Sequence, residues 1–133
     1  WQARIEAVQS QGLEALAEGV MQRWFAPAFL AKPELALWRN MLLRTPPEGY
    51  IAAARALAGA DQTAATAKLA LPCLVIAGAQ DGASPPDLVQ ATAALISGAE
   101  YQLLPDAGHL PCVETPKAWA AVVSPFLQRH CHD

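Results

Sequence analysis

The chain has 133 residues, of which 53% are hydrophobic and only 16% charged, and its formal net charge is −3. This length fits one domain with a real core, and the hydrophobic excess excludes intrinsic disorder. The slight negative charge argues against a nucleic-acid partner, and no apolar run reaches the roughly 20 residues that cross a bilayer.

The cysteines and the chain ends point to the same compartment. Cys73, Cys112 and Cys131 are odd in number and widely spaced, which is a poor disulfide framework and favours a reduced cytoplasm. We expect no signal peptide, because no basic segment followed by an apolar core opens the chain. The tail 130–133 holds metal-ligand side chains, but a frayed end is the expectation there, and no metal site is predicted.

The first part of the sequence is predicted to form helices. A short helix carries Ile5 and Val8 and is separated by Gly12 from a second one. The second helix has apolar residues at spacings of three and four, which form one stripe. Its members are Leu13, Leu16, Ala17, Val20, Met21 and Trp24.

Two further helices are expected before residue 60. The third begins at Pro33 and runs through Leu42. The fourth follows Thr45-Pro46-Pro47-Glu48, where a capping residue, prolines tolerated in a first turn and an acid suit a helix start. It is alanine-rich, and Gly59 is expected to stop it.

The second part of the sequence changes period. The apolar run Cys73–Ala77 is bounded by proline and glycine, as in a parallel strand buried on both faces, and 101–104 is a second short strand. A helix is expected from Pro85 to Gly98, and Thr115-Pro116 is expected to cap a last one. Strand, helix, strand, helix is the unit of an α/β fold.

We therefore divide the chain into a helical segment, 1–67, and an α/β segment, 68–133. The alanine-rich stretch 52–70 contains the boundary. Two strands cannot make such a sheet by themselves, so whatever covers the faces and the inner edge of Cys73–Ala77 is mostly absent from this sequence.

Chemistry is expected where the two strands end. Asp81 follows the first strand and His109 follows the second, so both lie at the sheet edge where ligands gather in open α/β folds. A carboxylate that binds one imidazole nitrogen fixes the tautomer and leaves the other nitrogen to act as a base. The chain order, acid before histidine, is that of α/β-hydrolases.

Simpler roles compete with this interpretation. A loop aspartate such as Asp81 also serves as a turn former or a cap, and a lone histidine in a glycine-containing loop is often structural. Asp106 and Asp87 are rival carboxylates, but Asp106 is too close to His109 in sequence and Asp87 suits a first helical turn. Glu114 is expected to support the last helix locally.

The motifs resemble those of a known family. The stretches 74–81 and 107–110, with Glu114-Thr115-Pro116, look like the C-terminal end of an α/β-hydrolase. The helical segment, with Arg23-Trp24-Phe25 and Pro47-Glu48-Gly49-Tyr50, resembles the cap of 3-oxoadipate enol-lactonases, and the similarity runs over essentially the whole chain. The sequence departs from the family at 82–84, where Gly-Ala-Ser replaces the usual proline and threonine, and at Ala54, where cysteine is common.

The resemblance implies a Ser-His-Asp enzyme of which this chain is a piece. Such enzymes are about twice as long, and the Gly-x-Ser-x-Gly elbow and the oxyanion-hole stretch of the front half are absent here. The serines of the chain are Ser10, Ser84, Ser97 and Ser124. Ser84 is nearest the predicted site but lies beside two prolines. We therefore expect the nucleophile to come from sequence outside the chain, and the chain alone to be inactive.

The resemblance also implies a substrate, the enol-lactone of the β-ketoadipate route of aromatic degradation, with Asp81 and His109 as the catalytic pair and no cofactor. Its carboxylate calls for a cap arginine, for which Arg23, Arg39 and Arg44 are candidates, although solvation accounts for each. Trp24 and Tyr50 could line the pocket, although packing also explains them.

Other functions stay open. The chain could belong to another α/β-hydrolase, such as an esterase or a haloperoxidase-like protein, or be a noncatalytic chain that associates with a serine-bearing partner. Its excess of apolar residues resembles the exposed half of a larger core. We expect a missing N-terminal half, a second chain or a second copy of this chain to cover the sheet edge.

Overall fold

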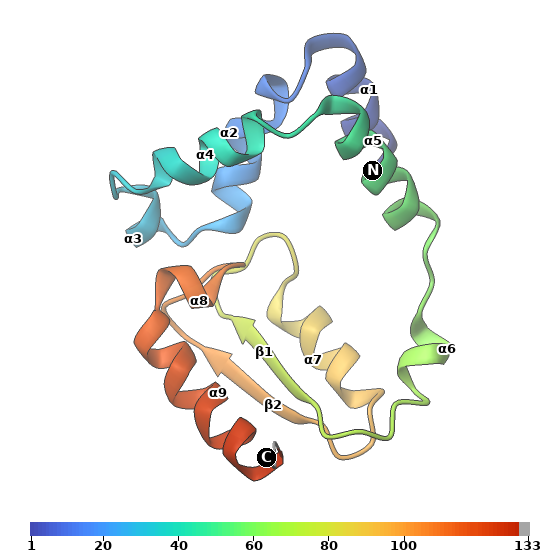
Figure 1. Ribbon diagram of the computed structural model, residues 1–133, viewed down its shortest axis with the longest axis vertical. Coiled ribbons are helices and arrows are strands. Elements are labelled where there is room, and N and C mark those ends of the chain that lie inside the picture. The colour runs from blue at the N-terminus through green and yellow to red at the C-terminus, as the bar shows by residue number, and fades with distance from the viewer. Residues whose placement is uncertain (131–133) are drawn as a thin grey trace. The chain divides into compact units, whose positions relative to one another are not determined.

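The computed structural model describes residues 1–130 and divides them into two compact units. The first unit comprises residues 1–22 and 27–61, and the second comprises 23–26 and 62 onward. Among these residues the regular elements are helices and two parallel strands, as the sequence predicts (Figure 1). Within the described residues, no helix combines the length and the apolar character that crossing a membrane requires.

The first unit is helical. It contains α1 (Gln2–Gln11), most of α2 (Glu14–Trp24), α3 (Pro27–Leu30), α4 (Leu35–Leu43) and α5 (Pro47–Gly59). Helix α1 packs against α5, and the buried side chains include much of the predicted stripe. They are Ile5, Val8, Leu13, Ala17, Val20, Met21, Phe29, Leu42 and Ala54. The tertiary burial of short apolar stripes holds helices of this length, because isolated ones are marginal in water.

The start of α5 differs from the expectation. Pro46 is the residue before the helix, and Pro47 occupies its first turn, so Thr45 lies too early to cap it. The Thr45 hydroxyl instead donates backwards to the Met41 carbonyl, at 3.2 Å. Two adjacent prolines set the boundary, because their fixed φ suits a first turn and neither has an N–H that needs a cap.

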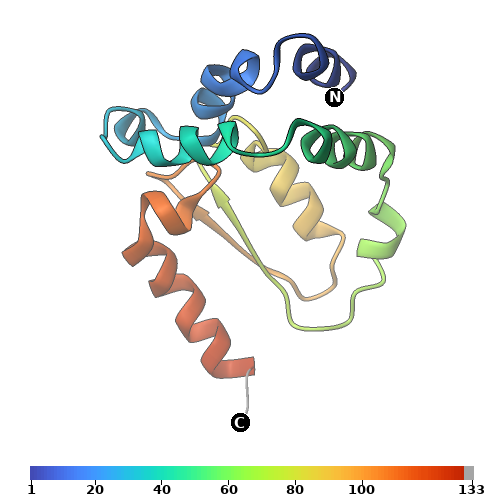
Figure 2. The same cartoon turned by 45° about the horizontal axis from the view of Figure 1, so that its top comes forward.

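The second unit contains the parallel pair β1 (Leu74–Gly78) and β2 (Glu100–Leu104). Leu74 is paired with Glu100 and Gly78 with Leu104, so both strands end at one edge. Helix α7 (Pro86–Ala94) packs against both strands, and α9 (Pro116–His130) packs against β2. Figure 2 shows β1 and β2 side by side from a second direction.

Three short helices and one boundary were not predicted. Helix α3 lies between the second and third predicted helices. Helix α6 (Thr63–Thr66) precedes β1, and α8 (Pro111–Glu114) follows the His109 loop. Helix α7 ends at Ala94 rather than running to Gly98, and Gly98 takes a positive φ of 76° in the turn before β2. A single turn of helix leaves too short a periodic pattern to be recognised in a sequence.

Strand β1 is less covered than the two-sided burial predicted for it. Leu74, Val75 and Ile76 are half-buried, and only Ala77 and Gly78 are buried. Within the described residues β2 is its only hydrogen-bonded neighbour, so its other edge offers unpaired backbone groups.

Candidate active site

Asp81 is held in a tight turn directly after β1. Its amide donates to the Gly78 carbonyl at 3.2 Å, and its Oδ1 accepts hydrogen bonds from the Ala83 and Ser84 amides at 2.7 and 2.9 Å. Asp81 is therefore a turn former, as one of the two interpretations has it. One carboxylate oxygen suffices for this task, and the other remains for a second partner.

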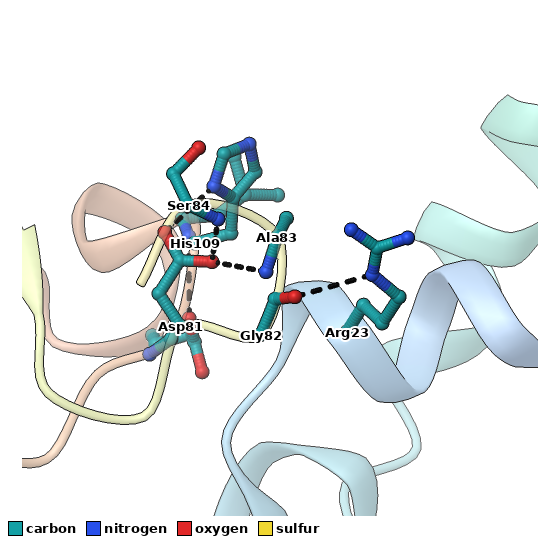
Figure 3. A network of polar contacts seen from close by, with 9 residues as sticks. Arg23, Asp81, Gly82, Ala83, Ser84 and His109 are labelled. Atoms are coloured by element: carbon teal, nitrogen blue, oxygen red, sulfur yellow. Dashed lines mark hydrogen bonds and ion pairs between the residues drawn. The ribbon is translucent and has the colours of Figure 1, made fainter. Parts of the chain in front are cut away.

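That second partner is His109. Its Nδ1 lies 2.8 Å from Asp81 Oδ2, so the predicted pair meets across the ends of the two strands (Figure 3). Because a carboxylate only accepts hydrogen bonds, this contact places the proton on Nδ1 and leaves a lone pair on Nε2. Figure 3 shows the second ring nitrogen directed away from Asp81. The Asp81 side chain is 5% exposed and that of His109 34%, so solvent reaches the imidazole but hardly the carboxylate.

The rival carboxylates have other positions. Asp87 is exposed in the first turn of α7, where the helix dipole accounts for an acid. Asp106 is exposed in the loop after β2. Asp81 alone of the three forms an ion pair with His109 within residues 1–130.

The loops that carry the pair touch each other through glycine. An ideal Cβ on Gly78 would lie 2.0 Å from the Gly108 carbonyl oxygen and 2.5 Å from that of Ala107. The Gln80 amide donates to the Ala107 carbonyl at 2.9 Å across the same contact. The absence of a side chain at Gly78 thus allows the His109 loop to pack directly on the end of β1.

A third segment, Arg23–Ala26, binds both loops. The Gly82 amide donates to the Arg23 carbonyl at 3.0 Å, and Arg23 Nε donates to the Gly82 carbonyl at 3.1 Å. The His109 amide donates to the Trp24 carbonyl at 2.7 Å, and the Trp24 and His109 rings are stacked with centroids 6.2 Å apart. Although α2 supplies Arg23 and Trp24, they belong to the second unit and fix the spacing of its two loops.

Glu114 has a different role from the local support of the last helix expected for it. Its buried carboxylate accepts hydrogen bonds from the Ala26, Gly108 and Leu110 amides. The helix α9 that follows starts at Pro116 without this side chain. The expectation was wrong because these partners lie in a loop and in a segment far away in the sequence.

The remaining candidates are distributed over both units. Arg23 and Trp24 lie beside the Asp81–His109 pair, whereas Tyr50 is half-buried on α5 in the first unit. Arg39 forms an ion pair with Glu14. Arg44 lines an open hollow of about 400 Å³ together with Leu37, Asn40 and Met41.

Metal ligands do not gather in the part of the chain that the structure describes, where no group of three or more histidine, cysteine or acidic side chains could hold an ion. His130 packs on Phe126 and lies 3.9 Å from Glu100. The rest of the tail, Cys131, His132 and Asp133, for which the sequence predicts no metal site, lies outside the described residues.

Comparisons with known proteins agree with these features. A sequence model of the alpha/beta hydrolase family matches residues 2–122. The chain is 34% identical over 131 residues to 3-oxoadipate enol-lactonase 2 of Acinetobacter baylyi, covering 97% of this chain and 49% of that protein. The crystal structure of the enol-lactonase from Burkholderia xenovorans LB400 superposes with a TM-score of 0.90 at 33% identity, over 96% of this chain and 50% of that one.

An esterase is almost equally similar. The thermophilic esterase from Thermogutta terrifontis is 34% identical with a TM-score of 0.85, over 94% of this chain and 47% of that one. The chain spans about half the length of the curated relatives it matches. The matches confirm the resemblance and the fold class predicted from the motifs: the chain belongs to the alpha/beta hydrolase family and corresponds to the C-terminal half of its fold.

Proposed function

We propose that this chain is the C-terminal half of a carboxylic-ester hydrolase in which His109 is the general base and Asp81 orients it. The observation that carries the proposal is the 2.8 Å contact between His109 Nδ1 and Asp81 Oδ2. A buried carboxylate and a partly exposed imidazole are the arrangement that base catalysis needs, because the base must reach its substrate while its partner stays dry.

The nucleophile in this proposal is a serine outside the 133 residues. His109 Nε2 takes the serine proton as Oγ attacks the ester carbonyl carbon, and the Asp81 carboxylate stabilises the imidazolium that forms. The imidazolium then gives this proton to the departing oxygen as the carbonyl–oxygen bond breaks. Water, deprotonated in turn by His109, cleaves the acyl-enzyme and restores the serine.

Enol-lactones are the substrate class that we favour. Two curated relatives, both from A. baylyi, are 3-oxoadipate enol-lactonases at 34% and 32% identity, and we extend the activity in their names to this chain. The product would be 3-oxoadipate, a dicarboxylate of the β-ketoadipate route of aromatic degradation, and its lactone precursor also carries a carboxylate. Arg23 would bind the substrate carboxylate, because only its Nε is bonded to Gly82 and Figure 3 shows its terminal nitrogens directed away from that carbonyl. Trp24, which stacks on His109, would contribute an apolar wall. Tyr50 lies in the first unit, and its contact with the substrate stays a prediction.

A simple ester is the second candidate substrate, since the T. terrifontis esterase has the same sequence identity to this chain, 34%, as 3-oxoadipate enol-lactonase 2. The two candidate functions can be distinguished by comparing a lactone that carries a carboxylate with a neutral ester. A lactonase would lose affinity for the lactone on Arg23→Ala but not for a neutral ester, whereas an esterase would respond equally to both.

Two expectations about the setting accompany the proposal. The front half of the protein would pair with the open edge of β1 and cover apolar side chains that are exposed here, such as Leu88 and Leu103. The free thiols of Cys73 and Cys112 support a reducing, cytoplasmic location.

A chimera tests the proposal. The front half of the B. xenovorans enol-lactonase, joined to residues 1–133, would supply the serine elbow in a context that this chain fits well, given the TM-score of 0.90. We expect this chimera to hydrolyse the enol-lactone and the chain alone to be inactive. A folded chimera that cleaves neither lactone nor ester would refute the proposed activity, and serine-dependent hydrolysis by the chain alone would refute its need for a front half.

A further inference from the structure

Glu114 is a buried acid with no cation beside it. The residue is 8% exposed, and within residues 1–130 no ion pair involves it. Burying an unpaired carboxylate is costly unless hydrogen bonds replace the lost water. The hydrogen bonds that the Glu114 carboxylate accepts must therefore replace its lost hydration.

Those contacts are with backbone amides from two separate segments. Oε1 accepts from the Gly108 amide at 2.8 Å and from the Leu110 amide at 3.3 Å, and Oε2 accepts from the Ala26 amide at 2.7 Å. Every buried polar side-chain atom among the described residues has a partner, so the carboxylate is satisfied by this set. Hydrogen bonds to a charged acceptor are the stronger kind.

The set encloses His109. The amides on either side of it bind Glu114, while its own amide donates to the Trp24 carbonyl at 2.7 Å. Three successive amides of the loop are thus engaged. The Glu114 carboxylate accepts hydrogen bonds from the two outer amides and also from the Ala26 amide, which lies in the same segment as Trp24. The peptide backbone from which the imidazole projects is therefore fixed at the loop and at its support together.

We propose that Glu114 is a positioning residue for His109. Its carboxylate ties the His109 loop to the segment Arg23–Ala26, and this tie keeps Nδ1 within hydrogen-bonding distance of Asp81. The importance of this role for turnover rests on the proposed function, whereas the effect on the His109–Asp81 contact is a property of the folded chain.

The Nδ1 proton of His109 provides a readout that general stability does not. In the 133-residue chain, nitrogen-15 NMR should show one ring Nδ1 proton protected from exchange with water, assigned by its loss in His109→Gln. The Ala26, Gly108 and Leu110 amides should be protected as well. A wild-type chain in which these amides exchange like free loop amides, or in which the Nδ1 proton is unprotected, would overturn the proposal without any variant.

Glu114→Ala removes all three bonds, and we expect the Nδ1 proton to exchange about tenfold faster or more. The reference is the Glu100 amide, which donates to the Cys73 carbonyl beside the strand pair and has no contact with this set. Acceleration beyond that of the reference amide supports positioning. Equal acceleration at both sites, or none at Nδ1, shows a role in stability alone and overturns it.

Glu114→Gln covers the case in which the alanine variant does not fold. A side-chain amide has one acceptor oxygen, so whichever way it is turned, its NH₂ group opposes either the Ala26 amide or the Gly108 and Leu110 amides. We expect about threefold faster Nδ1 exchange. The matched control is Glu48→Gln, the same change at an exposed position of α5. It should leave the exchange rate of the His109 Nδ1 proton unchanged.

This experiment requires no turnover, so its outcome is separate from that of the chimera. An inactive chimera combined with a Nδ1 proton that depends on Glu114 would remove the proposed function and keep the positioning role. Full hydrolysis by a Glu114→Ala chimera in which the exchange of the Nδ1 proton is unchanged would support the proposed function and overturn the positioning role.

Discussion

A methyl group at Gly78 is the most informative single perturbation of this site. Its Cβ would lie 2.0 Å from the Gly108 carbonyl oxygen, 2.5 Å from the Ala107 oxygen and 2.8 Å from the Ala107 carbonyl carbon. All three neighbours are backbone atoms, so no rotation of a side chain relieves the clash. The loop would have to retreat by about an ångström, and the approach of His109 to Asp81 would be lost with it.

The energetic cost can be estimated from this geometry. Overpacking in a well-packed region costs typically about 1–3 kcal/mol, and here the retreat also breaks the 2.9 Å hydrogen bond from Gln80 to Ala107. We expect Gly78→Ala to lower the free energy of unfolding by roughly 3 kcal/mol or more. Gly19 provides the control: it lies inside α2 with nothing within 4 Å of an ideal Cβ, so alanine there should stabilise by about 0.5–1 kcal/mol.

The assay is denaturant unfolding of both variants followed by circular dichroism, with the Nδ1 proton of His109 as a second signal. We expect the free energy of unfolding to fall in Gly78→Ala and to rise in Gly19→Ala. The Nδ1 proton of His109 should lose its protection from exchange only in Gly78→Ala. A Gly78→Ala chain within about 0.5 kcal/mol of the wild type would refute the close approach of the two loops.

Three further substitutions have defined outcomes. Asp81→Asn should keep the turn but present an amide to His109 and favour the wrong tautomer, lowering kcat of the chimera by about 10⁴-fold, measured as steady-state hydrolysis. Ser84→Ala should leave kcat within about twofold, because only the Ser84 backbone amide binds Asp81; a loss as large as that of Asp81→Asn would make Ser84 the nucleophile. Arg129→Ala removes a two-bond pair with Glu100 at 2.6 and 2.7 Å, and since both side chains are about half exposed, unfolding experiments should find a loss of at most about 1 kcal/mol, smaller in high salt.

The parts of the fold that were predictable are those with a local cause. The apolar run Cys73–Ala77 lies between a proline and a glycine, and β1 matches it to within one residue at each end. Thr115-Pro116 likewise marks the start of α9 at Pro116. The meeting of Asp81 with His109 followed from one rule, that parallel strands end at the same edge. No long-range information was needed for it.

The contacts that hold the pair could not be predicted in this way. Glu114 binds Ala26 across 88 positions of sequence, and nothing near either residue indicates the other. Arg23 and Trp24 belong to an amphipathic helix by their spacing, yet their backbone carbonyls serve the loops of the second unit. Backbone acceptors have no sequence signature, because every residue carries one.

The same limit explains the two interpretations of Asp81. A turn-forming aspartate and a histidine-orienting aspartate look alike in sequence, and this residue performs the first task with Oδ1 while Oδ2 faces His109. The two interpretations of Asp81 are therefore compatible, because each uses a different carboxylate oxygen.

The hydrolysis rate of the chimera carrying His109→Ala tests most directly whether His109 is the base. His130→Ala is the matched control, since His130 lies on α9 beside Phe126 and is no part of the Asp81 pair. We predict that His109→Ala lowers kcat by about 10⁴-fold or more while His130→Ala leaves it within about twofold. Equal rates for the two variants would contradict the assignment of His109 as the base.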